Sequence, residues 1–417
     1  MLGRILNRLS LSENKRRYLN LKGIISGRYA YKGPDVVQID LTDKCDCGCT
    51  ACWLHSPFLN KPPHGDFPEL EYGAVINLID ELKRRGTKEL IFSGGGEPFM
   101  HPRIWQVLEY AQGANLRFRL NTNLALLDEK DILRLTSFRK LVSVTASVWS
   151  GRQDLYAFLH NRPAQQFLRV KQNLRALNAA RKKGMEVKLY AVISNLNYFD
   201  LKAIAAMAQE TGCTGIEFGV IDAVAGATDR LLLNEDQLDI LKNGFLKLVN
   251  RMKNKKVRIV NKGLFLRRIS SPGAARGEYD GAVSKTPCYA GWFFLRVRAN
   301  GSVNSCLKSH RFPVGNIYKE SFGAIWNGRK QQFFRMSGIC LPRDKRLFSL
   351  MGNSAGSLGC SALCDNTVIN EHVHNRLRYT FAAKNLMLYG KERHWPLQVF
   401  RLRETLGLHF FKGRRPR

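Results

Sequence analysis

The sequence predicts an α/β fold with a parallel sheet, because strand-like and helix-like segments alternate through its middle part. Runs rich in β-branched and aromatic residues predict strands, and segments with apolar residues three to four positions apart predict helices. Such an alternation places consecutive strands in parallel, joined by crossover helices. Six strand–helix units of this kind imply a sheet that either curves into a partial barrel or stays open.

The expected strands share a β-rich, apolar composition and lie at 36–43, 89–96, 116–123, 140–148, 186–194 and 215–221. The expected helices share the 3.6-residue spacing of apolar residues and lie near 75–82, 103–112, 128–135, 167–177, 199–211 and 238–248. Sites in parallel sheets form at the carboxyl ends of the strands. The cysteine-rich stretch 44–53, the glycine run 94–96 and the stretch 121–123 stand at such ends. We therefore expect them to form one active site.

Length and composition narrow the classes of protein. A chain of 417 residues exceeds one average domain, and a barrel with a small appendage accounts for its length. No run approaches the roughly 20 apolar residues of a membrane span, and the start of the sequence makes a poor signal peptide. We therefore expect the protein in the cytoplasm, where thiols stay reduced. Its ten cysteines are expected to be metal ligands or catalytic groups before disulfides.

The net charge of +32, from 66 basic and 34 acidic residues, favours an anionic partner. Part of the excess gathers at the two ends of the chain, beside apolar residues at helical spacing. These end segments either dock on the core or attach to an anionic surface at the inner face of the membrane. Nucleic acid ranks third, because no nucleic-acid-binding module is recognisable. The basic residues concerned are Arg4, Arg8, Lys15, Arg16, Arg17, Arg414, Arg415 and Arg417.

Four cysteines stand within eight residues, at the end of the first expected strand. Three of them, Cys45, Cys49 and Cys52, have the spacing C-x3-C-x2-C. Three thiolates on a four-iron cubane cluster leave one iron open to a non-protein ligand. Zinc is the alternative, with His55 as a fourth ligand. The surplus residue, Cys47, is expected to be a small buried side chain and not a ligand.

A glycine run ends the second expected strand and is followed by an acidic residue. Gly95 and Gly96 let the backbone approach a ligand closely, and Glu97 offers a carboxylate that can hold an ammonium group. With the cysteine triad one strand–helix unit earlier, the stretch FSGGGEP resembles the radical S-adenosylmethionine (radical SAM) superfamily. The resemblance spans about 36–221.

This resemblance implies a partial (β/α)6 barrel of the TIM-like type. It also implies a [4Fe–4S] cluster whose open iron is chelated by SAM, and a 5′-deoxyadenosyl radical that abstracts hydrogen from a substrate. The implied cluster ligands are Cys45, Cys49 and Cys52. The residues that match the stretch holding the methionine amino group are Gly95, Gly96 and Glu97.

Two departures from the family pattern affect the contacts to SAM. The residues Asn121, Thr122 and Asn123 match a TNG-like turn near SAM, but Leu124 replaces its glycine. The aromatic residue often found before the third cysteine is replaced by Ala51. The second departure concerns contacts to the adenine and leaves the cluster unaffected.

The C-terminal cysteines resemble the SPASM/twitch extension, which holds auxiliary iron–sulfur clusters in some radical SAM enzymes. Gly301 is expected at the tip of a hairpin that brings Cys288 and Cys306 together. The chain has fewer cysteines than the full SPASM pattern, so we expect one auxiliary [4Fe–4S] cluster, with unligated core thiols as the alternative. The expected ligands are Cys288, Cys306 and Cys364 with either Cys360 or Cys340. Cys213, alone in a helix-to-strand turn, is expected to be structural.

The expected parts of the chain are a basic helical segment 1–33, a radical SAM partial barrel 34–260, a SPASM/twitch-like domain 280–370 and a basic helical tail 371–417. The motifs serve the cofactor, so they assign no catalytic residue and name no substrate. The basic ends favour an anionic small molecule that is phosphorylated, nucleotide-linked or lipid-linked. The alternatives are a SPASM-type peptide or protein maturase and a non-catalytic iron–sulfur protein on membrane or nucleic acid. An electron donor such as a flavodoxin or ferredoxin is also expected.

Overall fold

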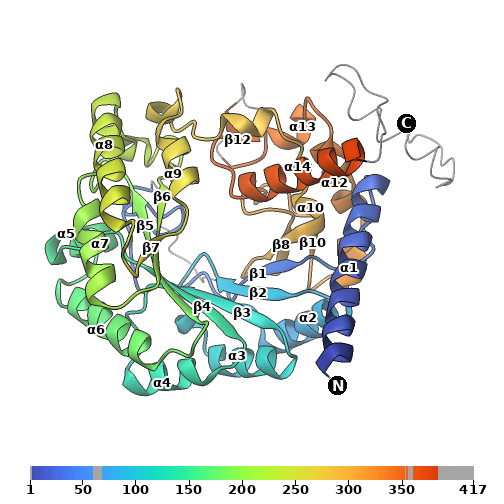
Figure 1. The fold of residues 1–417 in the computed structure, drawn as a ribbon, viewed down its shortest axis with the longest axis horizontal. Coiled ribbons are helices and arrows are strands. Elements are labelled where there is room, and N and C mark those ends of the chain that lie inside the picture. Colours follow the sequence, from blue (N-terminus) through green and yellow to red (C-terminus); the bar gives the residue numbers. More distant parts are fainter. Residues whose placement is uncertain (1, 60–67, 353, 356–359, 384–417) are drawn as a thin grey trace.

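The computed structural model describes residues 2–59, 68–352, 354–355 and 360–383 (Figure 1). The described part is organised around a ten-stranded sheet with helices along its outer face. The basic residues Arg414, Arg415 and Arg417 lie outside the described residues, so their contact with a membrane stays a prediction.

Six parallel strands follow one another across the sheet in chain order, which confirms the predicted α/β fold. These strands are β1 (Val36–Asp40), β2 (Glu89–Ser93), β3 (Arg117–Thr122), β4 (Leu141–Ser147), β5 (Glu186–Ile193) and β6 (Gly215–Val220). A short seventh strand, β7 (Arg258–Ile259), pairs in parallel with β6. The helices packed outside them are α2 (Tyr72–Arg84), α3 (Ile104–Gly113), α4 (Glu129–Ser137), α5 (Gln153–His160), α6 (Gln165–Ala180), α7 (Leu201–Glu210) and α8 (Glu235–Met252). Figure 1 shows the strands curving around an interior, as in a partial barrel.

Two helices follow β4 where the sequence predicts one. α5 ends at His160 because Asn161 adopts a left-handed conformation with a φ of 49°. Such a residue ends the helical hydrogen-bond pattern, and Pro163 keeps the residue before it out of the helical region. The longer α6 carries the apolar spacing that the sequence predicts, with Phe167 and Leu174 buried.

The C-terminal part adds three strands to the same sheet. β8 (Phe294–Val297) pairs in parallel with β1, and β9 (Ser302–Asn304) and β10 (Gly315–Asn316) follow in antiparallel pairing. β8 and β9 form the predicted hairpin, and its turn contains Gly301 with a φ of 79°. Glycine adopts this conformation without strain. The hairpin is therefore joined to the barrel by backbone hydrogen bonds.

The inner face of the sheet is polar. Asp40 of β1 pairs with Arg296 of β8 at 2.5 Å, and Glu89 of β2 pairs with Arg119 of β3 at 2.5 Å. Side chains along a strand alternate between the two faces of the sheet. The alternate residues are apolar, buried beneath the helices, and include Val37, Ile39, Leu90, Phe92, Phe118 and Leu120. Charged pairs therefore line the barrel interior.

The N-terminal helix α1 (Leu2–Ser26) docks on the barrel. Arg16 donates to the Asp35 carboxylate at 3.4 Å and to the carbonyl oxygen of Gly86. At least one of the basic residues at this end therefore contacts the core, as the docking alternative expects. Among the described residues, no helix is both long enough and apolar enough to cross a membrane.

Candidate active site

The loop after β1 holds the cysteines of the C-x3-C-x2-C motif. Burial raises the pKa of the Cys52 thiol, and the nearby Cys45 thiol raises it further. The backbone N–H groups of Leu54 and His55 donate to the Cys52 sulfur at 3.4 and 3.2 Å. Buried thiols that repel one another when ionised, with sulfurs that accept backbone hydrogen bonds, fit a cationic iron–sulfur cluster as ligands.

His55, which the sequence offers as a zinc ligand, joins two backbone segments instead. Its Nε2 lies 2.8 Å from the carbonyl oxygen of Asp43, and the ring also contacts the backbone of Gly95. A ring nitrogen that donates to a carbonyl is not available to a metal. This geometry excludes Nε2 of His55 as a zinc ligand.

The glycine run packs directly on the cysteine loop. The Gly96 N–H donates to the Thr42 carbonyl at 3.1 Å, and the Glu97 N–H donates to the Lys44 carbonyl at 2.8 Å. A Cβ atom on Gly96 would stand 1.9 Å from the Lys44 oxygen, and one on Gly95 would stand 2.1 Å from Asp43 Oδ1. Gly96 is therefore required for the close approach of the two motifs, because its neighbour is backbone, whereas a side chain at position 95 would force the Asp43 side chain to move.

Glu97 links the glycine run to the turn after β3. Its carboxylate accepts hydrogen bonds from Thr122 Oγ1 and from the Asn123 N–H, both at 2.7 Å. The side chain is buried, and burial raises the pKa of Glu97 to about 7. Asn121, near the end of β3, donates to Ser93 Oγ at 3.1 Å. The structure thus brings Glu97 and the predicted stretch 121–123 together.

The turn continues to the cysteine loop. The Asn123 Nδ2 donates to Asp46 Oδ1 at 2.6 Å and to the Cys47 sulfur at 3.3 Å. Leu124, which stands where the family turn has glycine, has a φ of 62°. A leucine in this region is strained by about 1–2 kcal/mol. The turn therefore keeps the backbone conformation of a glycine turn although its residue is leucine.

His160, which the sequence analysis does not single out, lies against the cysteine loop. Its Nδ1 is 3.2 Å from the Cys49 sulfur, and the ligand atoms of Cys47, Cys49 and His160 all lie within 4.8 Å of one another. Burial lowers the pKa of His160 to about 3, so the ring is neutral. No local sequence signal connects the two residues, because 111 positions separate them.

The C-terminal cysteines gather in a second cluster. Burial raises the pKa of Cys306 to about 12, and the neighbouring thiols of Cys288 and Cys360 contribute. The same neighbours contribute to the raised pKa of Cys364, after burial. The apolar cluster that holds these cysteines contains Cys288, Cys306, Phe334, Leu347, Phe348, Met351 and Cys360, with Cys364 packed against it. This donor set also fits an iron–sulfur cluster.

Cys340 and Cys213 lie elsewhere. Cys340 is exposed and does not belong to the apolar cluster that holds the four other C-terminal cysteines. Of the two alternatives for the fourth auxiliary ligand, the geometry therefore favours Cys360. Cys213 is buried beside Thr211 and Asn178 on the outer side of the barrel, where a structural role fits.

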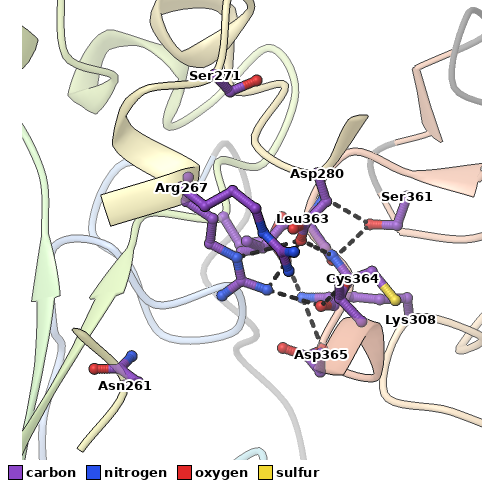
Figure 2. Close-up of polar contacts among 12 residues, drawn as sticks. Asn261, Arg267, Ser271, Asp280, Lys308, Ser361, Leu363, Cys364 and Asp365 are labelled. Atoms are coloured by element: carbon purple, nitrogen blue, oxygen red, sulfur yellow. Dashed lines mark hydrogen bonds and ion pairs between the residues drawn. The ribbon is translucent and has the colours of Figure 1, made fainter. Parts of the chain in front are cut away.

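A buried ion pair clamps Cys364 to the barrel. Arg268 pairs with Asp280 at 2.9 Å, with side chains 9% and 0% exposed. Asp280 Oδ2 accepts the Cys364 N–H at 2.8 Å, and Arg268 donates to the Cys364 carbonyl at 2.7 Å. Figure 2 shows Asp280 and Cys364 joined in this way. The pair thus satisfies both backbone groups of a candidate cluster ligand.

Lys308 makes a second link between the C-terminal part and the barrel. Its Nζ lies 2.5 Å from Asp222, which follows β6, and 3.3 Å from Asp365, which follows Cys364 (Figure 2). Burial alone would lower the pKa of Lys308, but Asp365 and Asp222 raise it. The lysine therefore stays charged and ties the second cysteine group to the carboxyl end of β6.

The fold and the two cysteine groups define the class of protein. Residues 39–208 match the radical SAM superfamily, and residues 288–348 match SPASM, an iron–sulfur cluster-binding domain. The chain belongs to the radical SAM superfamily and carries a SPASM extension. These domains imply [4Fe–4S] clusters and SAM as cofactors, which confirms the cofactor prediction.

Known proteins similar to the chain share this domain pair or part of it. The antilisterial bacteriocin subtilosin biosynthesis protein AlbA of Bacillus subtilis is 20% identical, over 87% of this chain and 74% of AlbA. The S-adenosylmethionine-dependent nucleotide dehydratase of Selenomonas ruminantium is 28% identical, over 40% of this chain and 58% of the dehydratase. Streptococcus suis SuiB bound to S-adenosylmethionine superposes with a TM-score of 0.58 at 15% identity, over 81% of this chain and 74% of SuiB. SuiB has also been solved with its precursor peptide SuiA.

Proposed function

We propose that this radical SAM protein is a maturase that modifies a peptide or protein, instead of the anionic small molecule first expected. The observation that carries the proposal is the link from Lys308 to Asp222 and Asp365, which sets the second cysteine group beside the barrel interior. A substrate in the interior would then lie between two groups of cluster ligands. Further support comes from AlbA and SuiB, whose names or titles refer to bacteriocin biosynthesis and to a precursor peptide.

Each described motif has a role in this proposal. Cys45, Cys49 and Cys52 hold the core cluster, and the buried Glu97 carboxylate attracts the ammonium group of SAM. When bound, the cluster and SAM supply the 5′-deoxyadenosyl radical that removes hydrogen from the substrate. The polar inner face of the sheet receives the substrate, and a donor such as a flavodoxin or ferredoxin delivers the electron.

A second candidate is an enzyme that acts on an anionic small molecule. The net charge of +32 favours it, as does the 28% identity with the nucleotide dehydratase. The two candidates differ in the substrate that donates hydrogen to the 5′-deoxyadenosyl radical, so an isotope experiment separates them.

The test uses anaerobically reconstituted protein, dithionite, SAM and fully deuterated peptides encoded beside its gene. We expect deuterium to appear in 5′-deoxyadenosine, measured by mass spectrometry, and the peptide to change mass. Deuterated nucleotides and nucleotide sugars serve as the comparison. Deuterium transfer from a nucleotide substrate, with none from the peptides, would contradict the maturase proposal and support the second candidate.

The pKa of Glu97 predicts how SAM binding depends on pH. Burial raises this pKa to about 7, so the carboxyl group loses its charge as the pH falls below 7. We expect the affinity for SAM to fall about tenfold per pH unit below that point, measured by equilibrium dialysis. Glu97→Gln should bind weakly at every pH, whereas Glu109→Gln, which alters an exposed pair with Arg134, should behave like wild type. A pH-independent affinity in wild type would contradict the assignment of Glu97.

A further inference from the structure

His160 is held in one orientation by its surroundings. It ends α5 and is fully buried. Its ring stacks on Tyr156 with centroids 4.3 Å apart and contacts Trp149 at 5.1 Å. A ring packed on two sides cannot turn to exchange the positions of its two nitrogens. The partners of Nδ1 and Nε2 are therefore fixed.

The partner of Nε2 determines the tautomer. The backbone N–H of Trp149 donates to His160 Nε2 at 3.2 Å. A neutral imidazole with an accepting Nε2 must carry its proton on Nδ1. This nitrogen is the one that lies 3.2 Å from the Cys49 sulfur. The contact is therefore an N–H···S hydrogen bond in which His160 is the donor.

The same tautomer argues against a metal-binding role for His160. Its nitrogen lies close to the sulfurs of Cys47 and Cys49, as in a mononuclear metal site. A nitrogen that carries a proton has no lone pair for a metal. If the proton moved from Nδ1 to Nε2, the Nε2–H would point at the Trp149 N–H, and that hydrogen bond would be lost. His160 consequently acts on the sulfur and not on a metal.

We propose that His160 is a positioning residue that sets the reduction potential of the core iron–sulfur cluster through its hydrogen bond to Cys49. The proposal rests on the ligand role of Cys49 given above. Reduction adds negative charge that spreads onto the ligand sulfurs, and a hydrogen bond to a sulfur stabilises that charge. His160 therefore makes the cluster easier to reduce by a one-electron donor.

Two amide variants separate the hydrogen bond from simple packing. In His160→Asn, the side-chain amide can stand where Nδ1 stands and keep the donor to Cys49. In His160→Gln, the longer side chain places its amide at the position of Nε2, where the amide oxygen can still accept from the Trp149 N–H. The Cys49 sulfur then has no hydrogen-bond donor from this residue. Both variants thus introduce a side-chain amide, but His160→Asn preserves the hydrogen bond to Cys49 and His160→Gln preserves the one from Trp149.

The measurement is a redox titration of the reconstituted protein without substrate, followed by electron paramagnetic resonance. The signal that changes on addition of SAM identifies the core cluster. We expect His160→Gln to disfavour reduction about tenfold, a 59 mV shift to more negative potential for a one-electron couple. His160→Asn should stay close to wild type, and iron content should be unchanged in both.

Other outcomes overturn the proposal. Equal potentials in wild type and both variants would show that the hydrogen bond has no electronic effect. Equal shifts in both variants would indicate a packing role, and loss of the core irons in both would indicate that His160 is a ligand. Failure to find a peptide substrate would leave the result intact, because no substrate is used. A wild-type protein without a SAM-responsive signal would overturn both this proposal and the ligand role of Cys49.

Discussion

Alanine at Cys45, Cys49 or Cys52 should abolish the formation of 5′-deoxyadenosine by reduced protein, whereas Cys47→Ala should retain it. Loss of one thiolate leaves an iron without its protein ligand, and the cluster is then not held in the orientation that leaves one iron open to SAM. The assay is anaerobic reconstitution, reduction with dithionite and quantification of 5′-deoxyadenosine by chromatography. We expect the three triad variants to give only background product.

Cys47 should differ from the triad because it lies outside the C-x3-C-x2-C spacing. Its sulfur accepts from Asn123 Nδ2 at 3.3 Å and lies 3.8 Å from the Gln166 amide, and its thiol also contacts the thiols of Cys45 and Cys49. Cys213→Ala, at a buried thiol distant from both cysteine groups, is the matched control and should also stay active. An inactive Cys47→Ala beside an active triad variant would show that the ligands are wrongly assigned.

The sequence was sufficient to predict the parallel sheet, because each of its strands carries a local signal. Buried strands such as β1 and β5 contain runs of β-branched and apolar residues that few other structures explain. The pairing of β8 with β1 could not be predicted, since it joins Val36 to Phe294 across most of the chain and leaves no periodic trace. Local patterns therefore identify strands, but they do not identify the neighbours of a strand from a distant segment.

The residues of the candidate site likewise fall into two groups, those with a local sequence signal and those without one. The spacing of Cys45, Cys49 and Cys52 and the glycine run before Glu97 are local motifs, so the sequence was enough to single them out. His160 could not be found, because its importance depends on a tautomer set by the Trp149 N–H. Gly96 proved to be needed for contact with the backbone of the cysteine loop, a packing requirement that only the folded backbone reveals.

The choice between Cys340 and Cys360 also required the fold. Both residues precede Cys364 in the C-terminal part of the chain, and spacing alone left them as alternatives. Cys360 begins the short strand β12 (Cys360–Ser361), which pairs with β11 (Ser354–Ala355) and is buried. Cys340 ends a helix at the surface. Tertiary burial, which no local pattern encodes, separates the two.

Breaking the Arg268–Asp280 pair should both destabilise the protein and empty the auxiliary site. Asp280→Asn leaves Arg268 charged and unpaired in a buried position, which costs about 3–5 kcal/mol of unfolding free energy. It also weakens the acceptor for the Cys364 N–H. With two cubane clusters, wild type should hold about eight irons per chain, and the variant about four. Iron analysis and denaturant titration measure the two effects.

A double variant separates positioning of Cys364 from stability. Arg268→Met with Asp280→Leu removes both charges, so it should recover much of the lost stability, because replacing a buried ion pair by apolar residues is often neutral. Iron should nevertheless stay near four per chain, because the Cys364 N–H has lost its acceptor and the Cys364 carbonyl keeps only the Thr367 hydroxyl. The neighbouring Arg267→Gln, which removes an exposed pair with Glu371, is the matched control and should keep the wild-type iron content and lose at most about 1 kcal/mol. Wild-type iron content in Asp280→Asn would show that the ion pair does not hold Cys364 for a cluster.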